Sequence, residues 1–138
     1  MVSHMCWINS DKVFGYLRHY GKDGFYFIDT NTNEFTECTT LSNLRSGDGH
    51  PSYNKGRIVI DTYPDKSRMQ HLYLYDIEEN KVFDILELFQ NVKYQGESRC
   101  DLHPRFSSDG TRIYFDTVYS GKRTLSYIDI SNLNAVKN

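Results

Sequence analysis

The fold is decided by one stretch, Asp101-Leu-His-Pro-Arg-Phe-Ser-Ser-Asp-Gly-Thr-Arg-Ile-Tyr-Phe-Asp-Thr117. It predicts a short strand ending at Phe106, a tight turn over residues 107–110, and a second strand over residues 112–116. Asp109-Gly110 between two apolar runs is a strong hairpin signal, because glycine takes a positive φ angle without steric cost. We therefore expect an antiparallel hairpin here, and the rest of the chain repeats it.

The repeat is marked by the pattern His-x-x-aromatic, which occurs at residues 4–7, 50–53 and 103–106. The three histidines are 46 and 53 residues apart. Each copy is followed by a polar turn, a β-rich run, a loop and a strand that closes on aspartate. The first two units add a fourth strand, near residues 34–38 and 81–85. Units of four short strands at this period are typical of β-propeller blades, so the predicted fold class is all-β.

The blades are expected at residues 1–45, 46–98 and 99–138 of a single propeller domain. The third is incomplete, because residues 131–138 show no β pattern. Residues 84–89 fit either an extended fourth strand or one helical turn. Natural propellers close with about four to eight blades, and an open fan exposes strand edges. We therefore expect either a piece of a larger protein or a homo-oligomer whose copies complete the ring.

Composition excludes several classes of protein. A length of 138 residues favours one domain, and a net charge of −2 gives no electrostatic reason to expect nucleic acid as a partner. No stretch approaches the roughly 20 apolar residues of a membrane span. The chain shows no signal peptide, which taken by itself predicts a cytoplasmic protein. Cys6, Cys38 and Cys100 lack metal-site spacing and are expected to be buried free thiols.

His4, His50 and His103 are the strongest candidates for a chemical site. In a propeller the first strand of each blade is innermost, so equivalent residues at its start point toward one mouth of the central channel. Three converging imidazoles suit Zn²⁺, Mn²⁺ or Fe²⁺, with open positions for a substrate carboxylate. The alternative is that this histidine is a structural habit of the repeat, which caps backbone groups at the blade junction.

Arg99, Asp101 and Arg105 flank His103 and are expected to reach the same mouth. An arginine matches a carboxylate with two parallel hydrogen bonds, so Arg99 or Arg105 is a candidate for binding an acidic sugar. The alternative is that Asp101 pairs with one of these arginines and ties the loop down. Two further sets repeat between blades, and for these we predict inter-strand salt bridges: Asp61 with Arg68, and Asp116 with Arg123.

The blade motif, His-Pro-x-aromatic-Ser-x-Asp-Gly followed by Ile-x-Phe-Asp, resembles TolB-type propeller repeats. Three segments also resemble propellers related to oligogalacturonate lyases: Gly49-His-Pro-Ser-Tyr53, Asp61-Thr-Tyr-Pro-Asp65 and Arg99-Cys-Asp-Leu-His-Pro-Arg105. The likeness covers almost the whole chain and corresponds to the later blades of that family. It implies cleavage of acidic oligosaccharides by β-elimination with a divalent metal, typically manganese, held by histidines and a glutamine.

The chain departs from that family in one loop. The lyase loop carries a glutamine and two closely spaced histidines, whereas here Gln95 is followed by a single histidine, His103, and Asp101 stands where a second ligand would fall. Two functions are therefore predicted. One is a carbohydrate-active propeller, either a metal-dependent lyase whose catalytic base is not assigned or a degenerate relative that binds sugar. The other is a non-catalytic scaffold for a protein partner.

Overall fold

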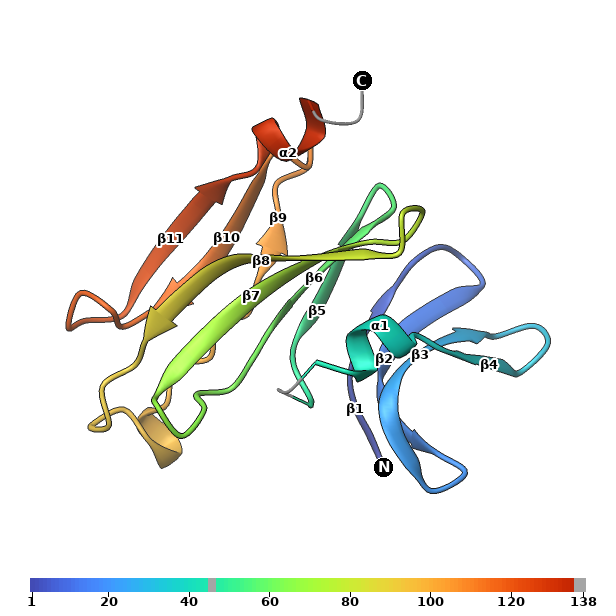
Figure 1. The fold of residues 1–138 in the computed structure, drawn as a ribbon, viewed down its shortest axis with the longest axis horizontal. Helices are drawn as coiled ribbons and strands as arrows, with labels where there is room; N and C mark the ends of the chain where they lie inside the picture. Colours follow the sequence, from blue (N-terminus) through green and yellow to red (C-terminus); the bar gives the residue numbers. More distant parts are fainter. Residues whose placement is uncertain (45–46, 136–138) are drawn as a thin grey trace.

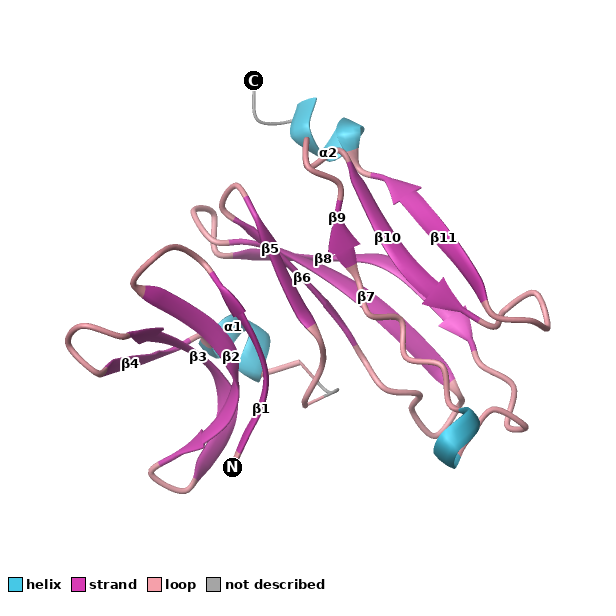
Figure 2. Ribbon diagram, turned by 180° about the vertical axis from the view of Figure 1, so that it is seen from behind, coloured by secondary structure: helices cyan, strands magenta, loops and turns pink. Residues whose placement is uncertain are grey.

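The computed structural model describes residues 1–44 and 47–135. These residues form three antiparallel sheets that stand beside one another like the leaves of a fan (Figure 1). Seen from behind, each sheet is a twisted blade whose first strand lies toward its neighbours (Figure 2). The inner strand of the middle sheet contacts the inner strands of both other sheets. The all-β architecture of successive propeller blades is thus confirmed.

Each blade runs up and down in sequence order. Blade 1 contains β1 (Val2–Trp7), β2 (Lys12–His19), β3 (Lys22–Asp29) and β4 (Glu34–Glu37). Blade 2 contains β5 (Pro51–Asn54), β6 (Arg57–Asp61), β7 (Met69–Asp76) and β8 (Lys81–Phe89). Blade 3 contains β9 (Arg105–Phe106), β10 (Arg112–Thr117) and β11 (Thr124–Asp129). Three short helical segments lie between or after these strands: α1 (Thr39–Ser42), the 3-10 turn η1 (Gly96–Ser98) and α2 (Ser131–Ala135).

Within the described residues, blades 1 and 2 have a fourth strand and blade 3 does not. Residues 84–89, which the sequence left open, continue β8 as a strand that pairs with β7, with a register shift at Ile85. In blade 3 the described chain turns into α2 after β11, so this sheet has three strands. The predicted lack of a β pattern after residue 130 is confirmed for residues 131–135, and residues 136–138 lie outside the described part.

The hairpin between β9 and β10 has the turn chemistry expected of Asp-Gly. Gly110 has a φ angle of 75°. The Asp109 carboxylate accepts hydrogen bonds from the Ser107 hydroxyl at 2.6 Å and from the Thr111 backbone N–H at 2.9 Å. The Ser107 bond is the largest cause that lowers the pKa of Asp109 to about 2. The turn is therefore held by local bonds that the sequence itself specifies.

Two hydrophobic cores bind the blades together, one in each gap. The first joins Phe14 and Phe25 of blade 1 to Ile58 and Ile60 of blade 2, and all four side chains are buried. The second packs blade 2 against blade 3 and contains these buried residues: Val59, Leu72, Leu74, Leu102, Ile113, Phe115 and Ile130. Because β6 alternates its side chains between the two gaps, Ile58 and Ile60 enter one core and Val59 the other.

The cysteines are free thiols, with Cys38 and Cys100 buried and Cys6 half-buried. Burial raises the pKa of the Cys6 thiol to about 12, so it is a packing residue rather than a nucleophile. Among the described residues, no helix is both long and apolar enough to cross a membrane.

Candidate functional site

The site begins at the loop that leads into β5. Gly49 packs so closely on the end of β6 that a Cβ atom there would lie 2.1 Å from the carbonyl oxygen of Asp61. Only glycine fits this approach, because real Cβ atoms do not come so near to backbone oxygen. The contact brings His50 directly against the side chain of Asp61. Asp61 is the last residue of β6 and lies at the same end of the blade as His50.

Asp61 is the buried centre of this arrangement. Its carboxylate accepts the backbone N–H of His50 at 2.6 Å and the backbone N–H of His103 at 3.0 Å. The His50 Nδ1 atom lies 3.0 Å from both carboxylate oxygens. The Asp61 side chain is fully buried, so these bonds replace the water that a carboxylate would otherwise need. One carboxylate therefore ties two blades together and sets the orientation of one imidazole.

The electrostatics of His50 follow from these neighbours. Burial by itself lowers the pKa of the His50 imidazole. The hydrogen bond and charge of Asp61 oppose burial, and the more distant charges of Asp101 and Asp48 add to them. Together they outweigh burial and raise this pKa above its ordinary value of 6.5. Since Nδ1 faces Asp61, Nε2 is the nitrogen that remains for a ligand.

The three repeat histidines lie in a row that we call the histidine column, His4, His50 and His103. The ring centroids of His4 and His50 are 3.9 Å apart, and those of His50 and His103 are 4.0 Å apart. His4 sits at a register shift of β1, where the strand bulges. His103 has a φ angle of 43°, in the left-handed region that few residues with side chains adopt. The structure thus brings together all three histidines that the sequence singled out.

Donor atoms suitable for one metal ion come together in a different set. Ligand atoms of His50, Asp101 and His103 all lie within 4.8 Å of one another. His4 instead turns its Nδ1 toward the Ser3 hydroxyl at 3.0 Å, with an Asp48 carboxylate oxygen 3.8 Å away. Two imidazoles and one carboxylate are a ligand set that Zn²⁺, Mn²⁺ and Fe²⁺ all accept.

Both candidate arginines already have carboxylate partners. Arg99 donates to the two oxygens of Asp101 at 2.7 and 3.0 Å. Its guanidinium also lies 4.5 Å from the ring centroid of Tyr63. Arg105 donates to the His103 carbonyl at 2.8 Å and to the Asp116 carboxylate at 3.3 Å. The alternative in which Asp101 ties the loop down thus describes the observed pairing, although both arginines keep partly exposed side chains.

The predicted repeat of Asp–Arg salt bridges is wrong in both blades. Asp61 binds histidines rather than Arg68, because β6 ends beside the His50 loop. Arg68 donates instead to the backbone carbonyls of Gln90 and Tyr94, at 3.1 and 2.8 Å. Asp116 pairs with Arg105, which lies beside it across the β9–β10 hairpin.

Sequence reasoning missed the roles of Asp61, Asp48 and Tyr63. One feature of the sequence indicates the role of Asp61. This charged residue directly follows a run of β-branched residues, which are buried, so its carboxylate needs a polar partner in the interior. Tyr63 meets His50 edge-on with ring centroids 5.8 Å apart, so an aromatic wall adjoins the histidine column. The repeat pattern of the sequence does not predict this contact between Tyr63 and His50.

Comparison with known proteins identifies the blade type. TolB from Acinetobacter baumannii aligns with a TM-score of 0.71 over 96% of this chain and 30% of that chain, at 15% sequence identity. The blades have a TolB-like β-propeller fold. A candidate TolB from Agrobacterium tumefaciens aligns with a TM-score of 0.60 over 89% of this chain and 43% of that chain, at 16% identity. No protein-family model and no curated protein matches the sequence.

These TolB-type neighbours show the fold alone, because their sequence identity to this chain is low. The chain spans about 30% of the first neighbour's length and 43% of the second's. The resemblance to oligogalacturonate lyases stays a prediction.

Proposed function

We propose that this TolB-like propeller binds a divalent metal ion through His50, Asp101 and His103, and through that ion the carboxylate of an acidic sugar. The observation that carries the proposal is the convergence of three donor atoms within 4.8 Å of one another. They come from two blades, and the buried Asp61 carboxylate contacts both histidine segments.

The spacing fits one ion after a small adjustment. Two ligands on opposite sides of an ion, each at about 2.1 Å, are at most about 4.2 Å apart. The donor atoms of the site lie within 4.8 Å of one another, which is slightly beyond this limit. Rotation of the Asp101 side chain can bring its carboxylate within the limit. His50 has the support that metal-bound imidazoles usually have, a carboxylate on the nitrogen that faces away from the ion. His4 would then cover the open side of the site rather than ligate.

The ligand class follows from the arginines. A metal that takes Asp101 competes with Arg99 for the same carboxylate oxygens. The released guanidinium then has a vacant pair of parallel donors, which suits an incoming uronate carboxylate. Tyr63, which packs beneath Arg99, offers an aromatic surface for a sugar ring. A bound metal that holds the uronate carboxylate acidifies the adjacent C–H, which is the first requirement for β-elimination.

Metal analysis tests this function. The purified protein is dialysed against Mn²⁺ or Zn²⁺, and we expect close to one ion per chain. His50→Ala and His103→Ala should each abolish stoichiometric binding, and Asp101→Asn should weaken it by 10-fold or more. His71→Ala is the matched control, because His71 lies on β7 and pairs with Asp84 outside the site. Stoichiometric binding that survives both histidine substitutions would contradict the proposal.

Sugar binding is measured separately by calorimetry with trigalacturonate, with and without metal. We expect binding that requires the metal and weakens in Arg99→Gln. Appearance of an unsaturated product would establish lyase activity, whereas binding without product would assign the chain to sugar-binding relatives. Binding of equal strength after removal of the metal would contradict the metal-mediated role.

A second function, a non-catalytic scaffold, is favoured by exposed apolar side chains on both end blades. Trp7 of β1 is 62% exposed and Leu125 of β11 is 61% exposed. Large exposed apolar side chains grouped on one sheet face are typical of protein contact surfaces. A metal-free protein that forms complexes through these faces would support this alternative.

A further inference from the structure

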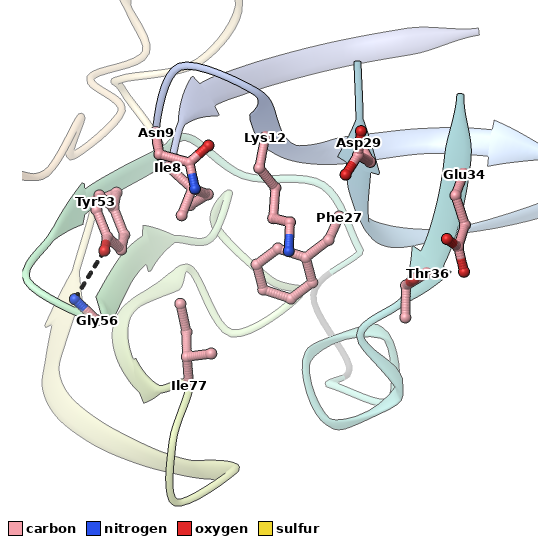
Figure 3. Close-up of a pocket in the computed structure, with 10 residues that line it drawn as sticks. All are labelled: Ile8, Asn9, Lys12, Phe27, Asp29, Glu34, Thr36, Tyr53, Gly56 and Ile77. Atoms are coloured by element: carbon pink, nitrogen blue, oxygen red, sulfur yellow. Dashed lines mark hydrogen bonds between the residues drawn. The ribbon is translucent and has the colours of Figure 1, made fainter. Parts of the chain in front are cut away.

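A cavity lies between blade 1 and blade 2 (Figure 3). Its lining residues Ile8 and Tyr53 stand further along the first strands than His4 and His50, so the cavity is displaced from the histidine column. It has a volume of about 390 Å³, and we call it the interblade cavity. Pockets for small ligands in proteins usually measure roughly 300–1,000 Å³. The lining residues are Ile8, Asn9, Lys12, Phe27, Asp29, Glu34, Thr36, Tyr53, Gly56 and Ile77. No member of the histidine column and none of Asp61, Arg99 or Asp101 takes part in it.

The floor of the interblade cavity is apolar and preformed. Ile8, Phe27, Tyr53 and Ile77 pack against the first interblade core, yet each remains only half-buried. The Tyr53 hydroxyl accepts the backbone N–H of Gly56 at 3.1 Å, which fixes the ring in the cavity wall (Figure 3). The floor is therefore a continuation of the core that is left open to a ligand, and an apolar group placed on it would be removed from water.

The rim of the interblade cavity carries charges of both signs. Asp29 and Glu34 lie on one side, Tyr53 and Ile77 on the other, and Lys12 between them (Figure 3). One oxygen of Asp29 accepts two backbone N–H groups, from Asn31 at 2.9 Å and Thr32 at 3.0 Å. These bonds, followed by the nearby Lys12 charge, lower the pKa of Asp29, so this carboxylate is ionised at neutral pH.

Lys12 and Glu34 are left with capacity for a ligand. Within the described part of the chain, neither the Lys12 ammonium nor the Glu34 carboxylate forms a hydrogen bond or an ion pair at contact distance. A ligand with only a carboxylate would pair with Lys12 but would be repelled by Asp29 and Glu34. A ligand with only an ammonium group would pair with these two carboxylates but would be repelled by Lys12. A molecule with both charges and an apolar body satisfies the floor and the rim together.

We propose that the interblade cavity binds a zwitterionic α-amino acid with a large apolar side chain, such as phenylalanine or leucine. The side chain lies on Phe27, Tyr53 and Ile77. The carboxylate pairs with the Lys12 ammonium, and the ammonium group pairs with Glu34. This site is independent of the histidine column, so each can fail without the other.

Titrations followed by ¹H–¹⁵N NMR test the ligand class. L-phenylalanine should shift the amide signals of Gly56 and Ile77, which border the cavity. 3-Phenylpropanoate lacks the ammonium group and phenethylamine lacks the carboxylate, and each should bind at least about 10-fold more weakly, which corresponds to about 1.4 kcal/mol. Equal binding of either analogue would overturn the zwitterion assignment, and shifts that avoid the cavity would overturn the site.

Substitutions then test the residues. Lys12→Met and Glu34→Gln should each weaken L-phenylalanine binding about 10-fold, because each removes one charge-assisted contact. Thr36→Trp places a bulky ring at the exposed rim and should abolish binding. The controls Lys122→Met and Glu97→Gln change the same residue types outside the cavity and should leave affinity unchanged. Undisturbed spectra of the free variants verify folding, and unchanged affinity in the rim variants would overturn the proposal.

Discussion

At the scale of single residues, Asp61 supports the candidate site more than any histidine does. It is fully buried and accepts hydrogen bonds from two backbone N–H groups, one in each of two neighbouring blades. Hydrogen bonds to a charged group contribute about 1.5–3 kcal/mol, and a buried donor left without its partner is costly. Asp61 therefore joins the stability of the propeller to the geometry of the site.

Replacement of this carboxylate by an amide is the direct test. Asp61→Asn keeps the volume but removes the charge, and one of its polar atoms becomes a donor that faces backbone donors. We expect the free energy of unfolding to fall by about 2–3 kcal/mol, measured by urea denaturation. Metal affinity should fall 10- to 100-fold, because the outer partner of a ligating imidazole is lost. Glu78→Gln, an exposed carboxylate-to-amide change in the β7–β8 turn of the same blade, is the control. Unchanged metal affinity in Asp61→Asn would show that His50 needs no such support.

At the scale of elements, each hairpin is held by turn residues and each gap by apolar side chains. The β9–β10 turn depends on Asp109, whose pKa is lowered to about 2, first by the Ser107 hydroxyl and then by the backbone and side chain of Thr111. A carboxyl with a depressed pKa in the folded state contributes stability above its unfolded pKa. That contribution is lost as the pH falls through the folded pKa.

Because the pKa of Asp109 is lowered in the folded state, its contribution to stability should depend on pH. Asp109→Ala should be less stable than the natural chain at pH 7, and the difference should shrink as the pH falls from about 4 toward about 2. Urea denaturation at several pH values measures it. Ser108→Ala, at an exposed position in the same turn, is the control and should follow the natural chain at every pH. A stability difference that does not change with pH would mean that the Asp109 charge is not what holds the turn.

The gap between blades 2 and 3 predicts a larger effect. Ile113 of β10 is fully buried in the second core, and truncation there leaves a cavity. Ile113→Ala should reduce the free energy of unfolding by about 2–5 kcal/mol. Val92→Ala, on a side chain that is 58% exposed in the loop after β8, should cost under about 0.5 kcal/mol. Comparable losses in the two variants would mean that blade 3 does not pack on blade 2 as described.

At the scale of the whole molecule, both end blades of the fan carry large exposed apolar side chains. Cys6 and Ile8 of blade 1 point toward the first core, so Trp7 between them faces away from it. Ile128 likewise points into the second core, so Tyr127, which is 56% exposed, faces outward. Burial of apolar surface contributes roughly 25 cal/mol per Å², which favours association of these two faces.

We therefore expect a homodimer in which blade 1 of one copy meets blade 3 of the other, closing a six-bladed ring with two-fold symmetry. Sedimentation analysis at micromolar concentration measures the mass. Trp7→Glu and Tyr127→Glu should produce monomers, whereas Tyr20→Glu, at an exposed hairpin tip, should not. A natural chain that is monomeric at this concentration would refute the dimer.

Local features of the sequence determined the blades. Asp109-Gly110, the alternation of residues 57–61 and the recurrence of His-x-x-aromatic act over a few residues, and hairpin pairing follows from them. The same repetition predicted that His4, His50 and His103 come together, because equivalent residues of successive blades share one end of a channel. The sequence also predicted the lack of a fourth strand in blade 3, since no β pattern follows residue 130.

How the site is held, and which atoms face one another, follows from the packing of one blade on the next. Asp61 reaches the backbone of His103 across 42 residues and a blade boundary, a contact that no local pattern encodes. The ligand atoms that converge with those of His50 and His103 belong to Asp101 and not to His4, although the His4 ring lies next to that of His50. The interblade cavity likewise exists only where two blades meet. Repetition predicts which residues are equivalent, whereas the packing of one blade on the next sets their distances and partners.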